Sequence, residues 1–237
     1  SRLRRSWSPN NVIAVLPSAP VILTMSRLFS RPLHRLLLSA IAGSLLALSF
    51  PPYGAYLILP FPFVLFYFCL LRASSWERFR LGFLFAFMFY LLHTYWFASF
   101  HPIVLPLMLF YLGFIFGVIH YGLSWVGINP FSMAGGWMVI QGVLGYGYQS
   151  FPWSRLSTAL AVEPFWIQPV GQVGEWAWGG LLVLLFYLIA ETIFRKKSII
   201  TALFVGVLVF LCLLNGLMGL GEIRNARLTR DVLLVQP

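Results

Sequence analysis

Apolar runs of about twenty residues follow one another along most of this sequence, and most of its charged residues lie outside these runs. An α-helix rises about 1.5 Å per residue and the bilayer hydrocarbon core is about 30 Å thick, so about 20 apolar residues are needed for one crossing. Only 9% of the residues are charged, whereas a soluble domain carries roughly a quarter. The sequence therefore predicts an all-α fold, a polytopic transmembrane helix bundle.

Seven segments are long and apolar enough to be candidate spans. They are residues 33–50, 55–71, 79–100, 103–126, 133–148, 174–194 and 199–220. Pro60 and Pro62 lie within the second segment. Because proline removes helical hydrogen bonds, a kinked helix is expected there.

Basic residues are divided unevenly between the two sides of these segments. Three clusters fall on one side: Arg27, Arg31 and Arg35; Arg72, Arg78 and Arg80; and Arg195, Lys196 and Lys197. The loops of the other side hold Arg155 as their only basic residue. By the positive-inside rule the first side is cytoplasmic, with the N-terminus, and the C-terminus is extracytoplasmic. The net charge of +10 thus indicates lipid headgroups rather than nucleic acid.

Both ends of the chain depart from this pattern. Residues 1–24 contain three prolines and a broken apolar run, so they are interpreted as a leader or a mis-called start ahead of Met25. The membrane domain is expected to occupy residues 25–222. The last residues, "DVLLVQP", have the pattern of a buried strand. Residues 223–237 are accordingly predicted to be a linker and the first strand of a further domain.

One connection, residues 148–174, is long and rich in proline, glutamine and aromatic residues. This composition predicts a loop that folds against the outer bilayer interface. Glu163 within it is interpreted as a solvated acid, with a pair to Arg155 or contact with a substrate amine as alternatives.

Two acids lie at the ends of the sixth segment. Glu175 opens it and is interpreted as a helix-end acid. Glu191 lies four residues before Arg195, which is the spacing of an interfacial ion pair. A buried acid inside a span is the functional alternative for both.

Thiols and small residues inside the segments are interpreted as packing. Cys69 and Cys212 lie in apolar helices, where a thiol holds little reactive thiolate. Gly113 and Gly117, in "GFIFG", form a small-xxx-small pair that predicts a close helix contact.

The histidines do not have the spacing of a metal site. His93 and His101 are eight residues apart near a proline, which favours polar packing over ligation, and His34 and His120 are expected at the interface. No metal and no cofactor are expected.

Four stretches, taken in chain order, point to one family. They are "LALSFPPYGAYLILPFPFVLFY", "GFLFAFMFYLLHTYWFASFH", "SFPWSRLSTALAVEPFWIQPVGQVGEWAWGGLLVLL" and "VLLVQP". Their order and spacing resemble the membrane half of the bacterial apolipoprotein N-acyltransferases over about residues 36–237. One departure is that Gln141 and Leu144 stand where the family has an acid and a base in the helix leading to Phe-Pro-Trp. That exchange removes an expected intramembrane ion pair.

The resemblance implies an inner-membrane enzyme that moves an acyl chain from a phospholipid to the α-amino group of a lipoprotein's diacylglyceryl cysteine. The implied catalytic set is Glu, Lys and Cys in an extracytoplasmic nitrilase-like domain of the carbon-nitrogen hydrolase class, working by ping-pong acyl transfer. This set is not in the present chain. The chain is therefore expected to be truncated, to have no catalytic residue and to be inactive alone, with the nitrilase-like domain following it or carried by a separate chain.

The resemblance also implies a lipid-entry mouth near Phe151, Pro152 and Trp153. Tyr95 and Trp96, at the end of the third segment, are expected to line the same mouth. These five residues are the candidate lipid contacts, and an ordinary interfacial aromatic belt is the alternative. The alternative function is a non-catalytic seven-span scaffold or lipid-binding protein.

Overall fold

The computed structural model describes residues 31–147, 150–195 and 199–225. In this part of the chain every regular element is helical, so the all-α prediction is confirmed for it. The elements are α2 (Pro32–Leu48), η2 (Tyr56–Ile58), α3 (Pro60–Leu71), α4 (Ser75–His93), η3 (Tyr95–Ser99), α5 (Val104–Val126), α6 (Pro130–Gly145), η4 (Pro152–Ser154), α7 (Leu156–Leu160), α8 (Pro164–Ile167), α9 (Val170–Val173), α10 (Glu175–Arg195) and α11 (Ile199–Asn225). The predicted leader and the predicted terminal strand lie outside the described residues.

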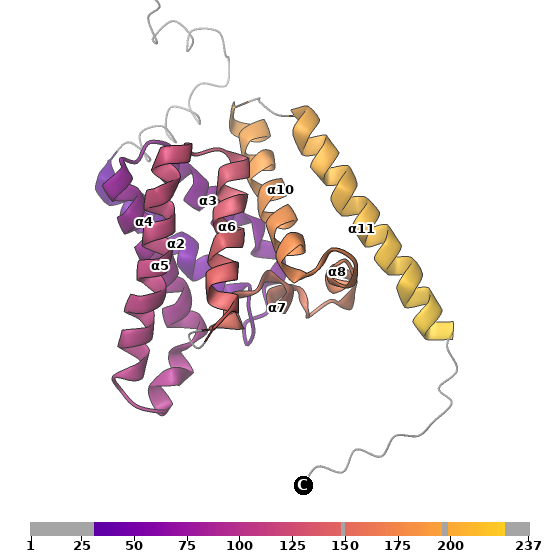
Figure 1. The fold of residues 1–237 in the computed structure, drawn as a ribbon, viewed down its shortest axis with the longest axis horizontal. Coiled ribbons are helices and arrows are strands. Elements are labelled where there is room, and N and C mark those ends of the chain that lie inside the picture. The colour runs from indigo at the N-terminus through magenta and orange to yellow at the C-terminus, as the bar shows by residue number, and fades with distance from the viewer. Residues whose placement is uncertain (1–30, 148–149, 196–198, 226–237) are drawn as a thin grey trace, which may run out of the picture.

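The long helices run up and down in chain order, so the connections gather at two ends (Figure 1). We call the end with the α3–α4, α5–α6 and α10–α11 connections the basic end, because the described members of the three basic clusters, Arg31, Arg35, Arg72, Arg78, Arg80 and Arg195, fall there. The other end, with η2, η3 and the short helices η4 to α9, is called the loop end. The last helix, α11, packs beside α10 and also contacts α8.

Local signals explain where the helices begin. Pro32, Pro60 and Pro130 each occupy the first turn of a helix, where the missing N–H has no helical partner to lose. At α6 the Asn129 side chain accepts from the Ser132 N–H, and the Ser132 hydroxyl accepts from the Asn129 N–H. The expected kink in the second span is wrong, because the short helix η2 ends just before Pro60, which begins α3 rather than interrupting it.

Helices α2 and α4 lie side by side in one register. Arg35 pairs with Glu77, the Ser39 hydroxyl donates to the Leu81 carbonyl at 2.8 Å, and Gly43 lies against the Phe85 carbonyl. Each of these pairs is 42 residues apart in sequence, and successive pairs are one helical turn apart. Two parallel helices with such a constant offset present the same face to each other over at least two turns.

Gly43 is expected to be irreplaceable at this contact. A Cβ on Gly43 would lie 2.1 Å from the Phe85 carbonyl oxygen, which is backbone and can move only if the helices separate. We expect Gly43→Ala to lower the free energy of unfolding by about 3 kcal/mol, because overpacking forces backbone shifts. Unfolding in mixed detergent micelles measures this change.

Gly135→Ala on α6 is the matched control, because nothing lies within 4 Å of its added Cβ. Alanine is also the better helix former, by about 0.8–1.0 kcal/mol in a helix interior. Equal stability losses in the two variants would contradict the proposed close packing of α2 on α4.

The antiparallel pair α4 and α5 confirms the close contact predicted for Gly113 and Gly117. A Cβ on Gly113 would lie 3.0 Å from the Phe83 ring, and one on Gly117 would lie 2.8 Å from the Phe79 ring. Gly82 on α4 faces α5 in the same way, with the Phe116 carbonyl oxygen 2.9 Å from its added Cβ. Glycines on both helices therefore let the backbones approach closely.

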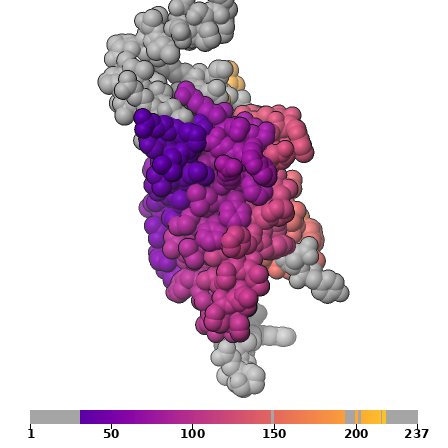
Figure 2. Space-filling model, turned by 90° about the vertical axis from the view of Figure 1, so that its left-hand side faces the viewer, coloured from indigo at the N-terminus to yellow at the C-terminus, as the bar shows by residue number. Residues whose placement is uncertain are grey.

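The outside of the bundle is apolar. Large hydrophobic side chains are exposed in stripes on α2 (Leu33, Leu37, Ile41), α5 (Leu107, Phe110, Phe114, Val118) and α11 (Leu203, Phe204, Val207, Phe210). A water-soluble protein rarely exposes such continuous apolar surface, whereas lipid-facing helices do. Among the described residues, Val104–Val126 and Glu175–Thr192 are long and apolar enough to cross a membrane. The side view shows α4 and α5 projecting at the loop end (Figure 2).

Candidate functional site

An aromatic cluster lies at the loop end, where α4 gives way to η3. The predicted third span continued to residue 100, but α4 ends at His93, and the Thr94 hydroxyl donates to the Tyr90 carbonyl at 2.6 Å. The chain then turns into η3, which presents its aromatic side chains at the tip of the bundle. We define the loop-end cluster as Trp96, Phe97, Phe100, Phe151 and Trp153.

Ring contacts join the two sequence segments of the loop-end cluster. The rings of Trp96 and Trp153 meet edge to face with centroids 5.7 Å apart, and those of Phe97 and Phe151 are also 5.7 Å apart. Aromatic pairs prefer such offset or perpendicular geometry. Trp96, Phe151 and Trp153, named from the sequence, are thus brought together, although their role as lipid contacts stays a prediction.

The remaining two candidates lie at the edge of the cluster. Tyr95 is 55% exposed and Pro152 is exposed, while Trp153 and Trp96 are 48% and 38% exposed. The cluster therefore combines half-buried rings with an open apolar face. Such a face suits contact with hydrocarbon chains or with the interfacial zone of a bilayer.

Buried polar groups hold the backbone of the Phe151–Ser154 turn. The Phe151 N–H donates to the Leu144 carbonyl at 2.7 Å, and the His93 Nε2 lies 2.9 Å from the Trp153 carbonyl oxygen. The Gln141 amide donates to both the carbonyl and the hydroxyl of Ser154, at 3.4 Å each. Polar packing, the interpretation preferred for His93, is confirmed. The part played by Gln141 was missed, because the sequence marks it only as a departure from the family.

An ion pair joins the long 148–174 connection to the first turn of α10. Arg155, just before α7, pairs with Glu175 in the first turn of α10, and the Ser157 hydroxyl donates to the same carboxylate. The described part of this connection forms η4, α7, α8 and α9, with Leu156, Ala159 and Leu160 buried, and its position against the outer bilayer interface stays a prediction. The suggested pairing of Arg155 with Glu163 is wrong, because Glu175 takes that place.

Two acids nearer the basic end contact side chains of neighbouring helices, Glu191 being buried and Glu77 half-buried. Glu191 accepts from the Tyr67 hydroxyl at 2.5 Å, which links α10 to α3. Glu191 is thus buried inside the bundle, and its suggested pair with Arg195 stays a prediction, because the side chain of Arg195 lies outside the described residues. Glu77, which the sequence did not single out, forms two hydrogen bonds of 2.8 Å with Arg35.

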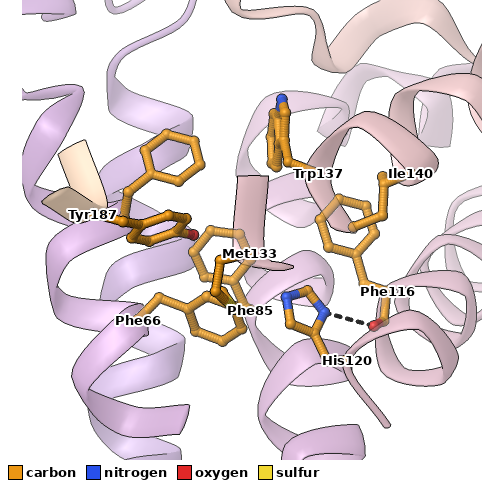
Figure 3. Close-up of a pocket in the computed structure, with 9 residues that line it drawn as sticks. Phe66, Phe85, Phe116, His120, Met133, Trp137, Ile140 and Tyr187 are labelled. Atoms are coloured by element: carbon orange, nitrogen blue, oxygen red, sulfur yellow. Dashed lines mark hydrogen bonds between the residues drawn. The ribbon is translucent and has the colours of Figure 1, made fainter. Parts of the chain in front are cut away.

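A small cavity lies inside the bundle, and it contains His120 (Figure 3). Its volume of about 10 Å³ is room for one water molecule, and most of its lining residues are aromatic: Phe63, Phe66, Phe85, Phe116, Trp137 and Tyr187. The His120 Nδ1 lies 2.7 Å from the Phe116 carbonyl oxygen. The expected interfacial position of His120 is wrong, and the cavity is far too small for a lipid.

Two larger hollows open on the outside of the described bundle. One, of about 520 Å³, lies between α10 and α11 and is lined by Leu185, Ile189, Leu203, Val207 and Phe210 among others. Another, of about 490 Å³, lies at the loop end between α7 and the α8–α9 segment and is lined in part by Ser157, Thr158 and Gln168. Their size is that of the pockets that hold small ligands.

Nucleophiles and metal ligands do not gather in the described part of the chain. Cys69 is fully buried in α3 and Cys212 is half-buried in α11, which agrees with packing roles. No group of three His, Cys, Asp or Glu side chains that could hold a metal occurs among the described residues. His101 is exposed and accepts from the Ile103 N–H.

Comparison with known proteins gives one family. The sequence model of the apolipoprotein N-acyltransferase N-terminal domain matches residues 42–188, which is more than half of the chain. The match extends from within α2 into α10 and includes both segments of the loop-end cluster. A search of curated proteins gave no match.

Proposed function

Because this chain belongs to the apolipoprotein N-acyltransferase family through its N-terminal domain, we propose that it is the membrane half of a phospholipid:apolipoprotein N-acyltransferase. The family match over residues 42–188 carries the proposal. The reaction moves an acyl chain from a phospholipid to the α-amino group of a diacylglyceryl lipoprotein. The Glu-Lys-Cys set resides in a nitrilase-like domain that follows residues 223–237 or is carried by a separate chain.

Seven helices of the bundle serve as spans in this proposal: α2, α3, α4, α5, α6, α10 and α11. The basic end faces the cytoplasm, because the three basic clusters of the sequence fall there. The loop end then faces outward, where the acceptor lipoprotein and the nitrilase-like domain are expected. The side of the membrane on which a reporter enzyme joined after Pro237 is active measures this orientation.

The loop-end cluster, with Tyr95 and Pro152, is the proposed contact for the acyl chains of the lipid substrate. The half-exposed rings of Trp96 and Trp153 supply apolar surface at the level of the bilayer interface. The hollow beside α7 adjoins the same end of the bundle and contains hydroxyl and amide groups for the polar part of a lipid. A second group of rings from two segments, Trp76 and Phe79 of α4 with Tyr121 and Trp125 of α5, lies at the basic end, and it serves as the comparison for lipid binding.

Trp153→Ala is expected to weaken binding of a short-chain phospholipid on the order of tenfold, because a central tryptophan at a binding surface contributes a large share of the affinity. Titration of the purified chain with such a lipid, followed by calorimetry, measures the dissociation constant.

Trp125→Ala is the matched control, because Trp125 is 81% exposed at the opposite, basic end of α5. An interfacial belt without a binding site predicts that the two variants lose affinity equally. That result would contradict the proposed lipid contact.

A further inference from the structure

We propose that His93 and Gln141 are positioning residues that fix the Phe151–Ser154 turn, and so hold the indole of Trp153 beside Trp96. This inference deepens the proposed function, since it concerns how the lipid-contacting face is kept in place. It begins from a contrast at the loop end between the exposure of Trp153 and the buried groups that hold its backbone. Trp153 is 48% exposed as a residue, while its backbone and that of Ser154 are held by hydrogen bonds from buried side chains of α4 and α6.

His93 is the stronger of the two anchors. The residue is 8% exposed, and its imidazole stacks on Phe89 with ring planes 7° apart and centroids separated by 5.4 Å. Phe50 packs against the same ring at 4.9 Å. Since a carbonyl oxygen can only accept, the Nε2 atom 2.9 Å from the Trp153 carbonyl must carry the proton. A ring held by packing against two aromatic neighbours, which also contact each other, thus aims one N–H at the turn.

Gln141 supplies a second anchor from α6. Its side chain is 6% exposed, and its amide reaches the carbonyl and hydroxyl of Ser154, which is fully buried. These bonds of 3.4 Å are longer than the usual 2.9–3.0 Å, so each is weaker than the His93 bond. The contacts are neutral, and an acid at position 141 would place a carboxylate against a carbonyl oxygen.

The two anchors lower the entropy that Trp153 loses when it binds a lipid. An indole on an unrestrained turn loses side-chain and backbone entropy when it binds a lipid. With the backbone of residues 153 and 154 held from α4 and α6, most of that cost is removed before binding. The edge-to-face contact between Trp153 and Trp96 is the local geometry that this arrangement maintains.

Fluorine NMR of the full 237-residue chain labelled with 5-fluorotryptophan tests the inference. The chain has nine tryptophans, and Trp96→Phe and Trp153→Phe assign the two relevant resonances. Trp178, fully buried in α10, reports on the overall fold. We expect His93→Leu and Gln141→Glu to shift or broaden the Trp153 and Trp96 resonances and to leave Trp178 in place. His93→Gln, which keeps an N–H donor, should retain the wild-type pattern, as should the control His101→Leu.

Unchanged Trp153 and Trp96 resonances in both His93→Leu and Gln141→Glu would overturn the inference. If the Trp178 resonance also shifts in those variants, the milder Gln141→Met variant is used instead. A shift of the Trp153 resonance in Gln141→Met would support the positioning role, and an unchanged Trp153 resonance would contradict it. Adding a short-chain phospholipid to the wild type separates the two proposals. The Trp153 resonance could respond to the His93 and Gln141 substitutions and yet show no shift on addition of lipid. That result would contradict the lipid contact and leave the positioning role intact.

Discussion

The purified 237-residue chain is expected to transfer no acyl chain from a phospholipid to a diacylglyceryl lipopeptide. Acyl transfer of the family type needs a thiolate nucleophile with a base beside it. The chain has two cysteines, of which Cys69 is fully buried in α3 and Cys212 is half-buried in α11. Neither is placed at the loop end, where the lipid contacts are proposed. Mass spectrometry of the lipopeptide detects the added acyl chain.

The same chain, joined after Pro237 to the nitrilase-like domain of a characterised family member, is the positive control. Transfer is expected to be gained in that fusion, and to be lost again when the nucleophilic cysteine of the added domain is replaced. Transfer by the 237-residue chain alone would contradict the assignment of catalysis to a nitrilase-like domain.

Replacing Glu77 with alanine is expected to lower the free energy of unfolding by about 3–5 kcal/mol, because it removes one partner of a buried ion pair. The Arg35 and Glu77 side chains are only 8% and 15% exposed, and two parallel hydrogen bonds of 2.8 Å join them. Such a bidentate pair has favourable geometry. Without the carboxylate, the guanidinium stays buried between α2 and α4. Unfolding in mixed detergent micelles measures the loss.

Two variants complete this test. The double variant Arg35→Met with Glu77→Leu should recover most of the stability, because buried apolar groups of similar volume replace the charges. Arg80→Ala, at an exposed position on α4, is expected to change stability by less than about 0.5 kcal/mol. A loss in Glu77→Ala no larger than in Arg80→Ala would contradict a structural role for the pair.

Hydropathy alone places the long helices well, because helix length and apolar content are local properties. The predicted segment at residues 103–126 differs by one residue from α5, and that at residues 174–194 differs by one residue at each end from α10. Errors occur where proline or tertiary contacts decide the boundary. Pro60 begins a helix instead of kinking one, and α4 starts at Ser75, which places Glu77 in its first turn beside Arg35.

The candidate site was predictable only in part. Resemblance to the family brought Trp96 and Trp153 together as candidates, and their ring contact agrees with that expectation. The anchors were not predictable. His93 and Gln141 are 60 and 13 residues from the turn residues that they contact, and each contact depends on the orientation of a side chain. The same is true of the Tyr67–Glu191 contact, whose partners are 124 residues apart. Such pairings depend on helix register, which sequence periodicity does not specify.

The claim that this chain is the membrane half of an apolipoprotein N-acyltransferase is tested most directly on the native protein. An antibody against residues 148–174 would isolate it from membranes of its source for measurement of mass and acyl transfer. A polypeptide of about twice 26.9 kDa, or one of 26.9 kDa with a bound nitrilase-like chain, that acylates a diacylglyceryl lipopeptide is the predicted result. A 26.9 kDa protein without such a partner and without transfer would contradict the claim.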